Sequence, residues 1–191
     1  MSAIKVITPA TLYPVTLTEA KLHLRVDSTD EDTLINMLIA AATSHAEDYT
    51  WRTIMPTVFE YVDDDFDHEI KIDTFPIATI DSIKYYDLTN TLQTVPSTQY
   101  ESNLLECPAE IEPASGYYWP DAYIRYDAVA VRFTAGYASA AVVPAAIKQA
   151  ILMMVSNMYE HREDEITGTI VSGLSFTSKH LLNTYRVNRF V

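Results

Sequence analysis

Residues 17–52 constrain the fold most, because apolar side chains recur there at helical spacing on both sides of a short polar turn. Thr18 can cap the first helical segment. The apolar face of that segment consists of Ala20, Leu22 and Leu24. After the turn at 27–30, the second segment continues the helical spacing with Leu34, Ile35, Leu38, Ile39, Ala42, Ala46 and Tyr49. The pattern predicts two helices within about 18–50.

From residue 57 the apolar spacing changes to two, which is typical of strands, and residues 1–16 look extended. Alternating segments lie at 58–62, 69–73, 80–86, 92–95, 100–104, 110–112 and 128–134. Pro144 then suits the first turn of a long helix over about 144–162, because a missing N–H costs nothing there. We predict an α+β fold: two N-terminal helices and a long C-terminal helix form a helical core, which carries a β-rich insertion at about 57–134.

The charge of the chain is acidic and unevenly distributed. Residues 1–165 hold all 26 acids and ten of the 13 lysines and arginines, a net charge of −16. Residues 166–191 hold three basic residues and no acid, a net charge of +3. We expect residues 1–165 to form a single domain and residues 166–191 to form an extended C-terminal arm.

The sequence carries no motif of catalysis or cofactor binding. Cys107 is the only cysteine, and no two histidines have the i, i+4 spacing of a helical metal pair. None of the four glycines forms GxGxxG, a P-loop or GxSxG. We therefore expect no catalytic residue, no cofactor, no metal site and no enzyme activity, and we interpret the acidic run at 63–69 as a solvated loop. The sequence also shows no membrane span.

Two blocks of sequence carry a likeness to a known family. The first runs from LTEAKLHLRVD at 17–27 through an acidic turn and an alanine-rich segment to Tyr49. The second contains VRFTAGY at 131–137, VPA at 143–145, IKQAIL at 147–152 and YEHRE at 159–163. Both blocks resemble the head–tail connector (head-completion adaptor) family of tailed bacteriophages, whereas residues 55–128 match it only loosely.

The resemblance implies a structural virion protein without a catalytic residue. Its copies would form a homo-oligomeric, dodecameric ring that docks on the portal protein after DNA packaging. The ring would extend the DNA channel, let DNA pass without specific binding, and join the head to the next connector (stopper) or to a tail-completion protein. We therefore expect the chain at the head–tail junction of the virion, after assembly in the host cytoplasm.

The basic C-terminal arm is the candidate portal-docking segment, because arginine and aromatic residues often anchor interfaces and because the resembling family places its tail against the portal. The candidate docking residues are Lys179, Tyr185, Arg186, Val187, Arg189 and Phe190. Glycine, serine and threonine before them favour an arm that is mobile when free and ordered when bound. Within the arm, Leu181 and Leu182 indicate a short helix at about 176–185. The alternative is a frayed terminus.

The long C-terminal helix has apolar residues on two sides, so it needs two neighbours. Leu152 and Met153 lie off its core stripe and are the candidate subunit interface; the alternative is that the sheet covers them. The net charge of −13 argues against ordinary nucleic-acid binding and also fits a second class of function. That alternative is an acidic DNA mimic, which would occupy a nucleic-acid-binding enzyme and should stay monomeric or dimeric.

Overall fold

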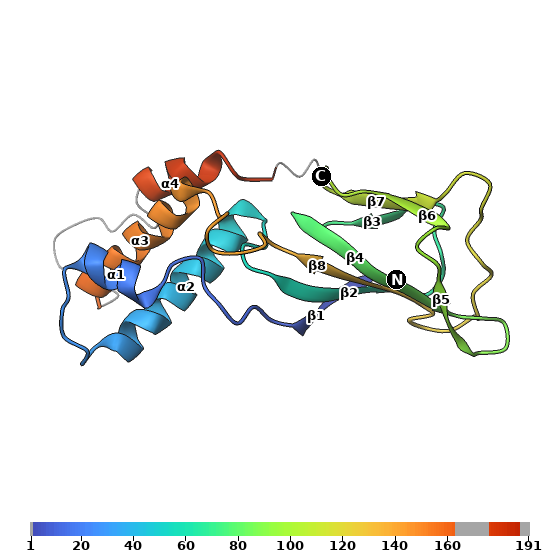
Figure 1. Cartoon of the computed structure of the whole chain (residues 1–191), viewed down its shortest axis with the longest axis horizontal. Coiled ribbons are helices and arrows are strands. Elements are labelled where there is room, and N and C mark those ends of the chain that lie inside the picture. Colours follow the sequence, from blue (N-terminus) through green and yellow to red (C-terminus); the bar gives the residue numbers. More distant parts are fainter. Residues whose placement is uncertain (1, 163–175, 188–191) are drawn as a thin grey trace. The chain divides into compact units, whose positions relative to one another are not determined.

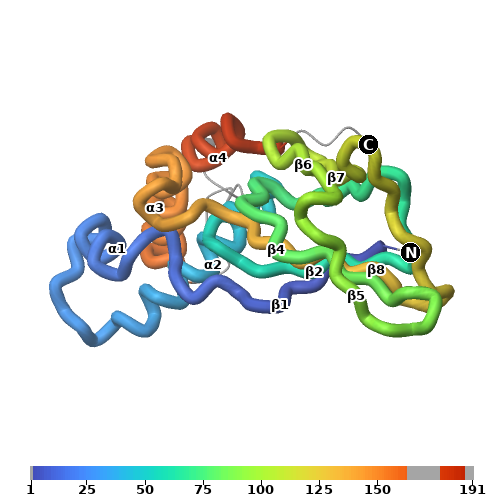
Figure 2. The backbone as a smooth tube through the Cα atoms, turned by 45° about the vertical axis from the view of Figure 1, so that its right-hand side comes forward, coloured from blue at the N-terminus to red at the C-terminus, as the bar shows by residue number. Residues whose placement is uncertain are grey.

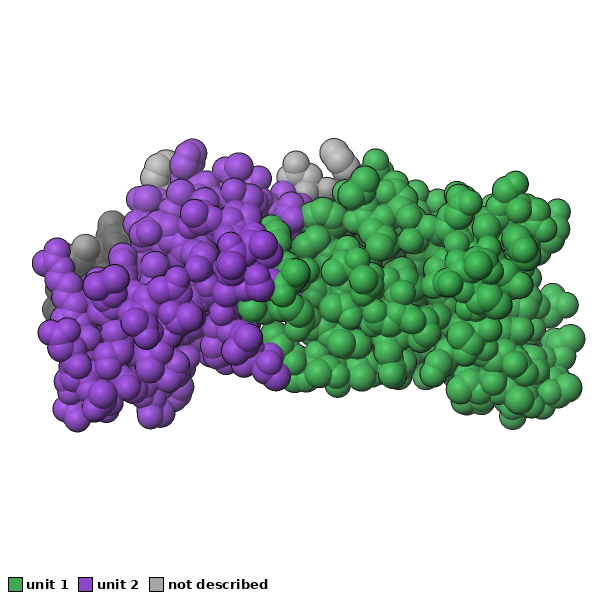
Figure 3. Space-filling view, viewed as in Figure 1, with its two compact units in different colours: residues 1–10, 55–138, 191 green, residues 11–54, 139–190 purple. Residues whose placement is uncertain are grey.

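The computed structural model describes residues 2–162 and 176–187, which divide into two compact units (Figure 3). Residues 2–10 and Met55–Ala138 form the first, called the β unit below. Thr11–Ile54 and the described residues from Ser139 onward form the second, called the helical unit. Figures 1 and 2 follow the chain from the β unit into the helical unit and back, so both units are assembled from segments that are distant in sequence.

The described part of the helical unit contains α1 (Leu17–Leu24), α2 (Asp32–Thr50), α3 (Ala145–Glu160) and α4 (Phe176–Asn183). Helix α3 packs against α2, α4 and α1 (Figure 1). The side chains buried on α2 and α3 recur at helical spacing and include Ile35, Ile39, Ala42, Ala46, Ile147, Ile151, Met154 and Val155. These are positions that the apolar pattern predicts, so the structure confirms both helices and their buried faces.

The start of α1 differs from the prediction. Thr16, not Thr18, caps the helix, and its Oγ1 accepts a hydrogen bond from the Glu19 N–H at 3.2 Å. Glu19 Oε2 accepts in return from the Thr16 N–H at 2.7 Å, which completes a capping box. The predicted apolar face is also only partly right, because Ala20 is buried but Leu22 is 81% exposed. The reciprocal cap therefore decides where α1 begins, and the short helix packs mainly through a small side chain.

Two antiparallel sheets make the β unit (Figure 1). Sheet A has the strand order β1-β2-β8-β4-β5, and sheet B has the order β3-β7-β6. The strands of sheet A are β1 (Ala3–Thr8), β2 (Thr57–Asp63), β8 (Val129–Ala135), β4 (Ile77–Tyr86) and β5 (Leu92–Val95). Those of sheet B are β3 (Ile70–Ile72), β7 (Ala109–Pro113) and β6 (Tyr100–Asn103).

The core of the β unit joins apolar side chains from both sheets. Sheet A contributes Tyr61, Ile77, Ile83, Val95, Val131, Phe133 and Ala135, and sheet B contributes Ile70, Ile72, Ala109 and Ile111. Along β8 every second residue is buried, as expected for a strand with one face toward a core. Phe59 of β2 stacks on Phe133 of β8 with ring centroids 5.5 Å apart. The two sheets thus share one hydrophobic cluster.

The structure confirms the α+β class and each of the seven alternating segments, with ends that agree within three residues. Two features differ from the prediction. Residues 3–8 are not a separate extended segment but strand β1, which pairs with β2 and extends sheet A beyond the insertion. The described part of the C-terminal arm is not extended throughout, because Phe176–Asn183 forms the helix that Leu181 and Leu182 indicate.

Gly136, directly after β8, occupies a position that only glycine fits. Its φ is +109°, a region that side chains with a Cβ rarely adopt. A Cβ added there would lie 2.4 Å from the backbone O of Met55, and the Gly136 N–H donates to Pro76 O at 2.8 Å. The close approach fixes the end of β8 against the segment that leads into β2.

We predict that Gly136→Ala destabilises the protein by about 2–5 kcal/mol, because it combines backbone strain with a clash against backbone atoms that cannot rotate away. Urea denaturation followed by circular dichroism measures this loss. Gly116→Ala is the matched control: its φ is +86° but nothing lies within 4 Å of the added Cβ. That variant should lose only about 1–2 kcal/mol. Equal losses in the two variants would show that the contact with Met55 contributes nothing.

Candidate assembly and docking surfaces

Helix α4, which opens the described part of the predicted docking arm, is packed into the helical unit. Its Leu182 and Ser178 side chains are almost completely buried, and the helix packs against α3 and α2. The prediction of an arm that is mobile when free is therefore wrong for residues 176–187. Apolar burial, which the Gly, Ser and Thr content did not reveal, holds this part of the arm in place.

The segment after α4 is bonded to the end of α2. The Val187 N–H donates a hydrogen bond to Thr50 O at 2.9 Å. Arg52, just beyond α2, donates from Nε to the carbonyl oxygen of Tyr185. These two hydrogen bonds hold the segment at 185–187 against the end of α2.

The candidate docking residues differ in their exposure. Lys179 on α4 and Arg186 beyond it are exposed, and the Arg186 guanidinium lies 5.4 Å from the centre of the Tyr49 ring. Tyr185 and Val187 are half-buried. Lys179, Tyr185, Arg186 and Val187 thus lie in the described part of the arm, each at least partly accessible. Two further candidates lie outside the described residues, namely Arg189 and Phe190.

The candidate subunit-interface residues, Leu152 and Met153, lie side by side on α3 and are both half-buried. Three helices of the same unit already pack against α3. Its fully buried side chains are the core stripe that includes Ile147 and Ile151, which matches the predicted division of the helix into a core side and a second apolar side.

Ion pairs link three of the basic side chains of the helical unit to carboxylates of the same unit. Lys21 contacts Asp32 at 2.6 Å, and Lys148 contacts Glu19 at 3.0 Å. The Thr16 N–H, with Lys148, holds the pKa of the Glu19 carboxyl below its ordinary value. These bridges join α1 to α2 and α3, so the charges stabilise the unit internally.

Glu31, at the start of α2, bridges in the same way to the end of α3. It accepts hydrogen bonds from the Tyr159 hydroxyl and from Arg162 Nη2, the latter at 2.6 Å. The two donors, Tyr159 first, lower the pKa of the Glu31 carboxyl. A negative charge at this position is favourable for the dipole of α2. The Glu31 carboxylate therefore stabilises both α2 itself and its packing against α3.

The outer face of sheet A carries a charged row across three strands. Lys5 on β1, Glu60 on β2 and Arg132 on β8 stand directly opposite one another. Glu60 contacts Lys5 at 2.8 Å and Arg132 at 2.9 Å, and the hydrogen bond from Lys5 is the main cause that lowers the pKa of its carboxyl. Opposite charges in facing positions stabilise strand pairing, so this row supports the register of the sheet.

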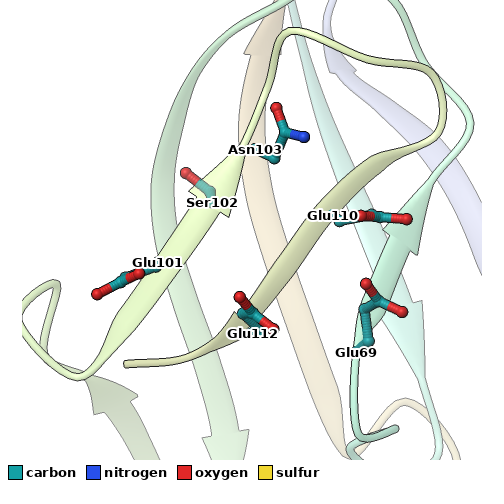
Figure 4. Close-up of a pocket in the computed structure, with 6 residues that line it drawn as sticks. All are labelled: Glu69, Glu101, Ser102, Asn103, Glu110 and Glu112. Carbon is teal, nitrogen blue, oxygen red and sulfur yellow. The ribbon is translucent and has the colours of Figure 1, made fainter. Parts of the chain in front are cut away.

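The outer face of sheet B is acidic. A cavity of about 210 Å³ on this face is lined by Glu69, Glu101, Ser102, Asn103, Glu110 and Glu112 (Figure 4). Lys71 lies 3.1 Å from Glu69 and 3.3 Å from Glu110, so it neutralises part of the charge. Glu101 and Glu112, however, face each other directly on β6 and β7, an arrangement that is unfavourable for strand pairing. The face therefore keeps a negative potential.

Two carboxylates of the acidic run at 63–69 accept hydrogen bonds from neighbouring segments of the β unit. Asp63 accepts a hydrogen bond from the Tyr61 hydroxyl at 2.9 Å, and Asp64 accepts from the Asp127 N–H at 3.1 Å. Burial, and then the bond to Asp63, raise the pKa of Tyr61 to about 12. Among the described residues, no group of three or more His, Cys, Asp or Glu side chains is placed to hold a metal ion.

Sequence reasoning missed an exposed aromatic surface in residues 117–126, called the aromatic loop below. The loop joins β7 to β8 and exposes Tyr117, Tyr118, Tyr123, Ile124 and Tyr126. The available signal was the concentration of tyrosine in the stretch GYYWPDAYIRY, which has neither helical nor strand periodicity. Tyrosine is enriched at protein interfaces, so the aromatic loop is a candidate contact surface.

The chain belongs to a family of virion connectors. A family model described as phage gp6-like head–tail connector protein matches residues 14–111, which cover α1, α2 and much of the β unit. The match includes the first resembling block and most of residues 55–128, where the sequence resembles the family only loosely. Members of this family are structural proteins rather than enzymes, so the chain is a structural head–tail connector of the virion.

Solved structures share the fold over almost the whole chain. A chain in the neck of an empty GTA particle, computed with C6 symmetry, has a TM-score of 0.79 at 20% identity and covers 99% of this chain and 97% of that one. A chain in the virion of a native gene transfer agent (GTA) particle has a TM-score of 0.78 at 20% identity, with 98% and 97% coverage. A chain in the neck of a native GTA particle, computed with C12 symmetry, has a TM-score of 0.78 at 18% identity, with 99% and 97% coverage.

No curated protein sequence matches the chain. No helix in the described part of the chain is long and apolar enough to cross a membrane.

Proposed function

We propose that this protein forms a ring that docks on the portal after DNA packaging, extends the DNA channel and receives the next connector (stopper) or a tail-completion protein. The observation that carries the proposal is the near-complete fold match to chains of GTA particle necks, two of which were computed with C6 and C12 symmetry. Rotational symmetry of this kind supports a closed ring, and C12 supports the expected dodecamer. Membership of the head–tail connector family supports the position of the ring at the head–tail junction. Assembly in the host cytoplasm is part of the same proposal.

The charge distribution fits a channel wall. Residues 1–165 carry a net charge of −16, and at least six of their ten lysines and arginines form ion pairs with carboxylates. DNA binding requires free basic groups at the phosphates, whereas an acidic wall repels them. DNA would therefore slide through the ring without specific binding.

An acidic DNA mimic is the alternative function, and the glutamates on sheet B favour it. Oligomeric size separates the two functions, because a mimic acts as a monomer or dimer and a connector acts as a ring.

The portal-docking surface in this proposal is the end of the C-terminal arm. Lys179 and Arg186 are exposed, and two main-chain hydrogen bonds fix the segment from which residues 188–191 continue. Within an otherwise acidic chain, this surface is the region with net positive charge. An acidic rim on the portal would complement it.

We predict that Arg186→Glu combined with Arg189→Glu weakens binding to purified portal, and that the weakening is larger at low salt than at high salt because ions screen exposed charges. Surface plasmon resonance at two salt concentrations measures this difference. Deletion of residues 188–191 should also weaken binding and leave the fold intact. A longer deletion from residue 177 is unsuitable, because it removes the buried Leu182.

Arg25→Glu is the matched control, since it reverses an exposed arginine of the same unit that lies outside the arm. It should bind the portal as the wild type does. Portal binding that is unchanged in the double variant and in the truncated chain would refute docking through the arm and would direct attention to α1 and α2.

We further propose Leu152 and Met153 as a contact between subunits, and predict that Leu152→Asp or Met153→Asp blocks ring assembly while the monomer stays folded. A charged side chain would have to be desolvated in the contact, which is costly. Analytical ultracentrifugation in the presence of portal reports assembly, and circular dichroism reports folding. Met37→Asp on the exposed side of α2 is the control and should assemble normally. If both α3 variants unfold the monomer, the two residues are core and the proposed contact is wrong.

A further inference from the structure

An apolar row crosses all five strands of sheet A and is left uncovered at one end. Ile4 of β1 stands opposite Tyr61 of β2, and the row continues on β8, β4 and β5 with Val131, Ile83 and Val95. The four residues beyond β1 are buried in the core between the sheets. Ile4 is 41% exposed, although its position in the row is equivalent to theirs.

The neighbouring row repeats this pattern. Val6 of β1 stands opposite Phe59 of β2, which stands opposite Phe133 of β8. Phe133 is fully buried, whereas Val6 is 56% exposed. The shared core of the two sheets therefore leaves the inner face of β1 bare.

The backbone of β1 is also open on one side. Within the described residues β1 pairs with β2 alone, at the edge of sheet A, and all six of its residues are exposed. Exposed edge strands in isolated proteins are usually blunted by proline, by a charge pointing inward or by a covering segment. The strand AIKVIT contains no proline, and its one charge, Lys5, lies on the outer face beside Glu60. Together with Ile4 and Val6, this edge is called the β1 edge below.

The aromatic loop is an exposed surface that is anchored to the rest of the β unit. Its Trp119 ring stacks on Phe66 with centroids 4.8 Å apart, and its Tyr123 N–H donates to Tyr86 O at 2.8 Å. With its backbone held by these contacts, the loop presents side chains that are almost completely exposed: Tyr118 at 90%, Ile124 at 97% and Tyr126 at 83%. A fixed loop loses little conformational freedom when a partner covers it.

The aromatic loop and the β1 edge are two different surfaces of the β unit. The loop lies beyond the ends of β2 and β4: the Tyr123 N–H donates to Tyr86 at the end of β4, and the Asp127 N–H, directly after the loop, donates to Asp64, just after β2, at 3.1 Å. Arg125 also donates to Asn90, in the turn between β4 and β5, at 3.2 Å. A ring requires two different, complementary surfaces on each subunit, because its contacts run head to tail.

We propose that, in the ring, the aromatic loop of one copy covers the β1 edge of the next copy. The inference rests on the proposed ring function and names the surfaces that close it. Tyr118 and Ile124 of one subunit then lie over Ile4 and Val6 of its neighbour, and the contact is heterologous, so a chain that keeps one surface can join only one partner.

Cysteine cross-linking tests this contact. In a Cys107→Ser background, the protein carrying both Val6→Cys and Ile124→Cys is treated with a short bis-maleimide, free at high concentration and bound to portal. Gel electrophoresis should show a ladder of cross-linked species larger than dimers. A mixture of two chains, one with Val6→Cys and the other with Ile124→Cys, should give dimers only, and each of these chains alone should give none. Val6→Cys combined with Leu22→Cys, an exposed apolar residue of α1, is the control and should give no ladder.

Absence of the ladder in both states would overturn the proposed contact, as would dimers formed by either single-cysteine chain alone, because these would show a contact between identical surfaces. Portal binding is measured separately on the same proteins. A ladder without portal binding would support the contact and refute the docking function. Portal binding without a ladder would support the docking function and refute the contact.

Discussion

The alternation of buried and half-buried residues along β8 is the constraint on which the β unit depends. This strand pairs with β2 on one side and with β4 on the other, so it joins the two halves of sheet A. Its inward side chains reach the isoleucines of sheet B, and a slip of one residue would turn all of them to the outer face. Gly136 ends the strand where the chain must approach the backbone of Met55 closely. A central strand fixed by both packing and backbone contact gives β1 and the aromatic loop defined positions on the β unit.

The surface of the protein has regions that differ in net charge. At least six of the ten lysines and arginines among residues 1–165 form ion pairs, so little positive charge remains on the body. The outer face of sheet B is negatively charged because of its glutamates, and the C-terminal arm has a net positive charge from three basic residues. Copies of such a chain repel one another, so a ring must be held by apolar contacts. The exposed β1 edge, the aromatic loop and the second side of α3 are surfaces that can supply such contacts.

Secondary structure followed from the sequence wherever a whole face is buried. The period of two at 128–134 and the period of 3.6 at 147–158 reflect burial against a core, and both predictions are confirmed. The cap of α1 was predicted at the wrong threonine, although Glu19 lies at the capping-box spacing from Thr16 and bonds back to it in the structure. The Gly, Ser and Thr content of the arm predicts mobility, but Leu182 is buried. The helix that carries it packs against α3, which is distant in sequence, so local composition does not reveal this burial. The aromatic loop has no periodicity, so no pattern of burial pointed to it; its proposed role depends on a contact with another copy, which leaves no periodic signal in the sequence.

The central claim is that copies of this chain form a ring on the portal. Electron microscopy of the purified protein mixed with its portal tests this claim most directly. The expected result is an added layer of density with twelvefold symmetry at one end of the portal, into which the two compact units fit. Portal particles without an added layer, in the presence of excess protein that stays monomeric or dimeric, would contradict the claim.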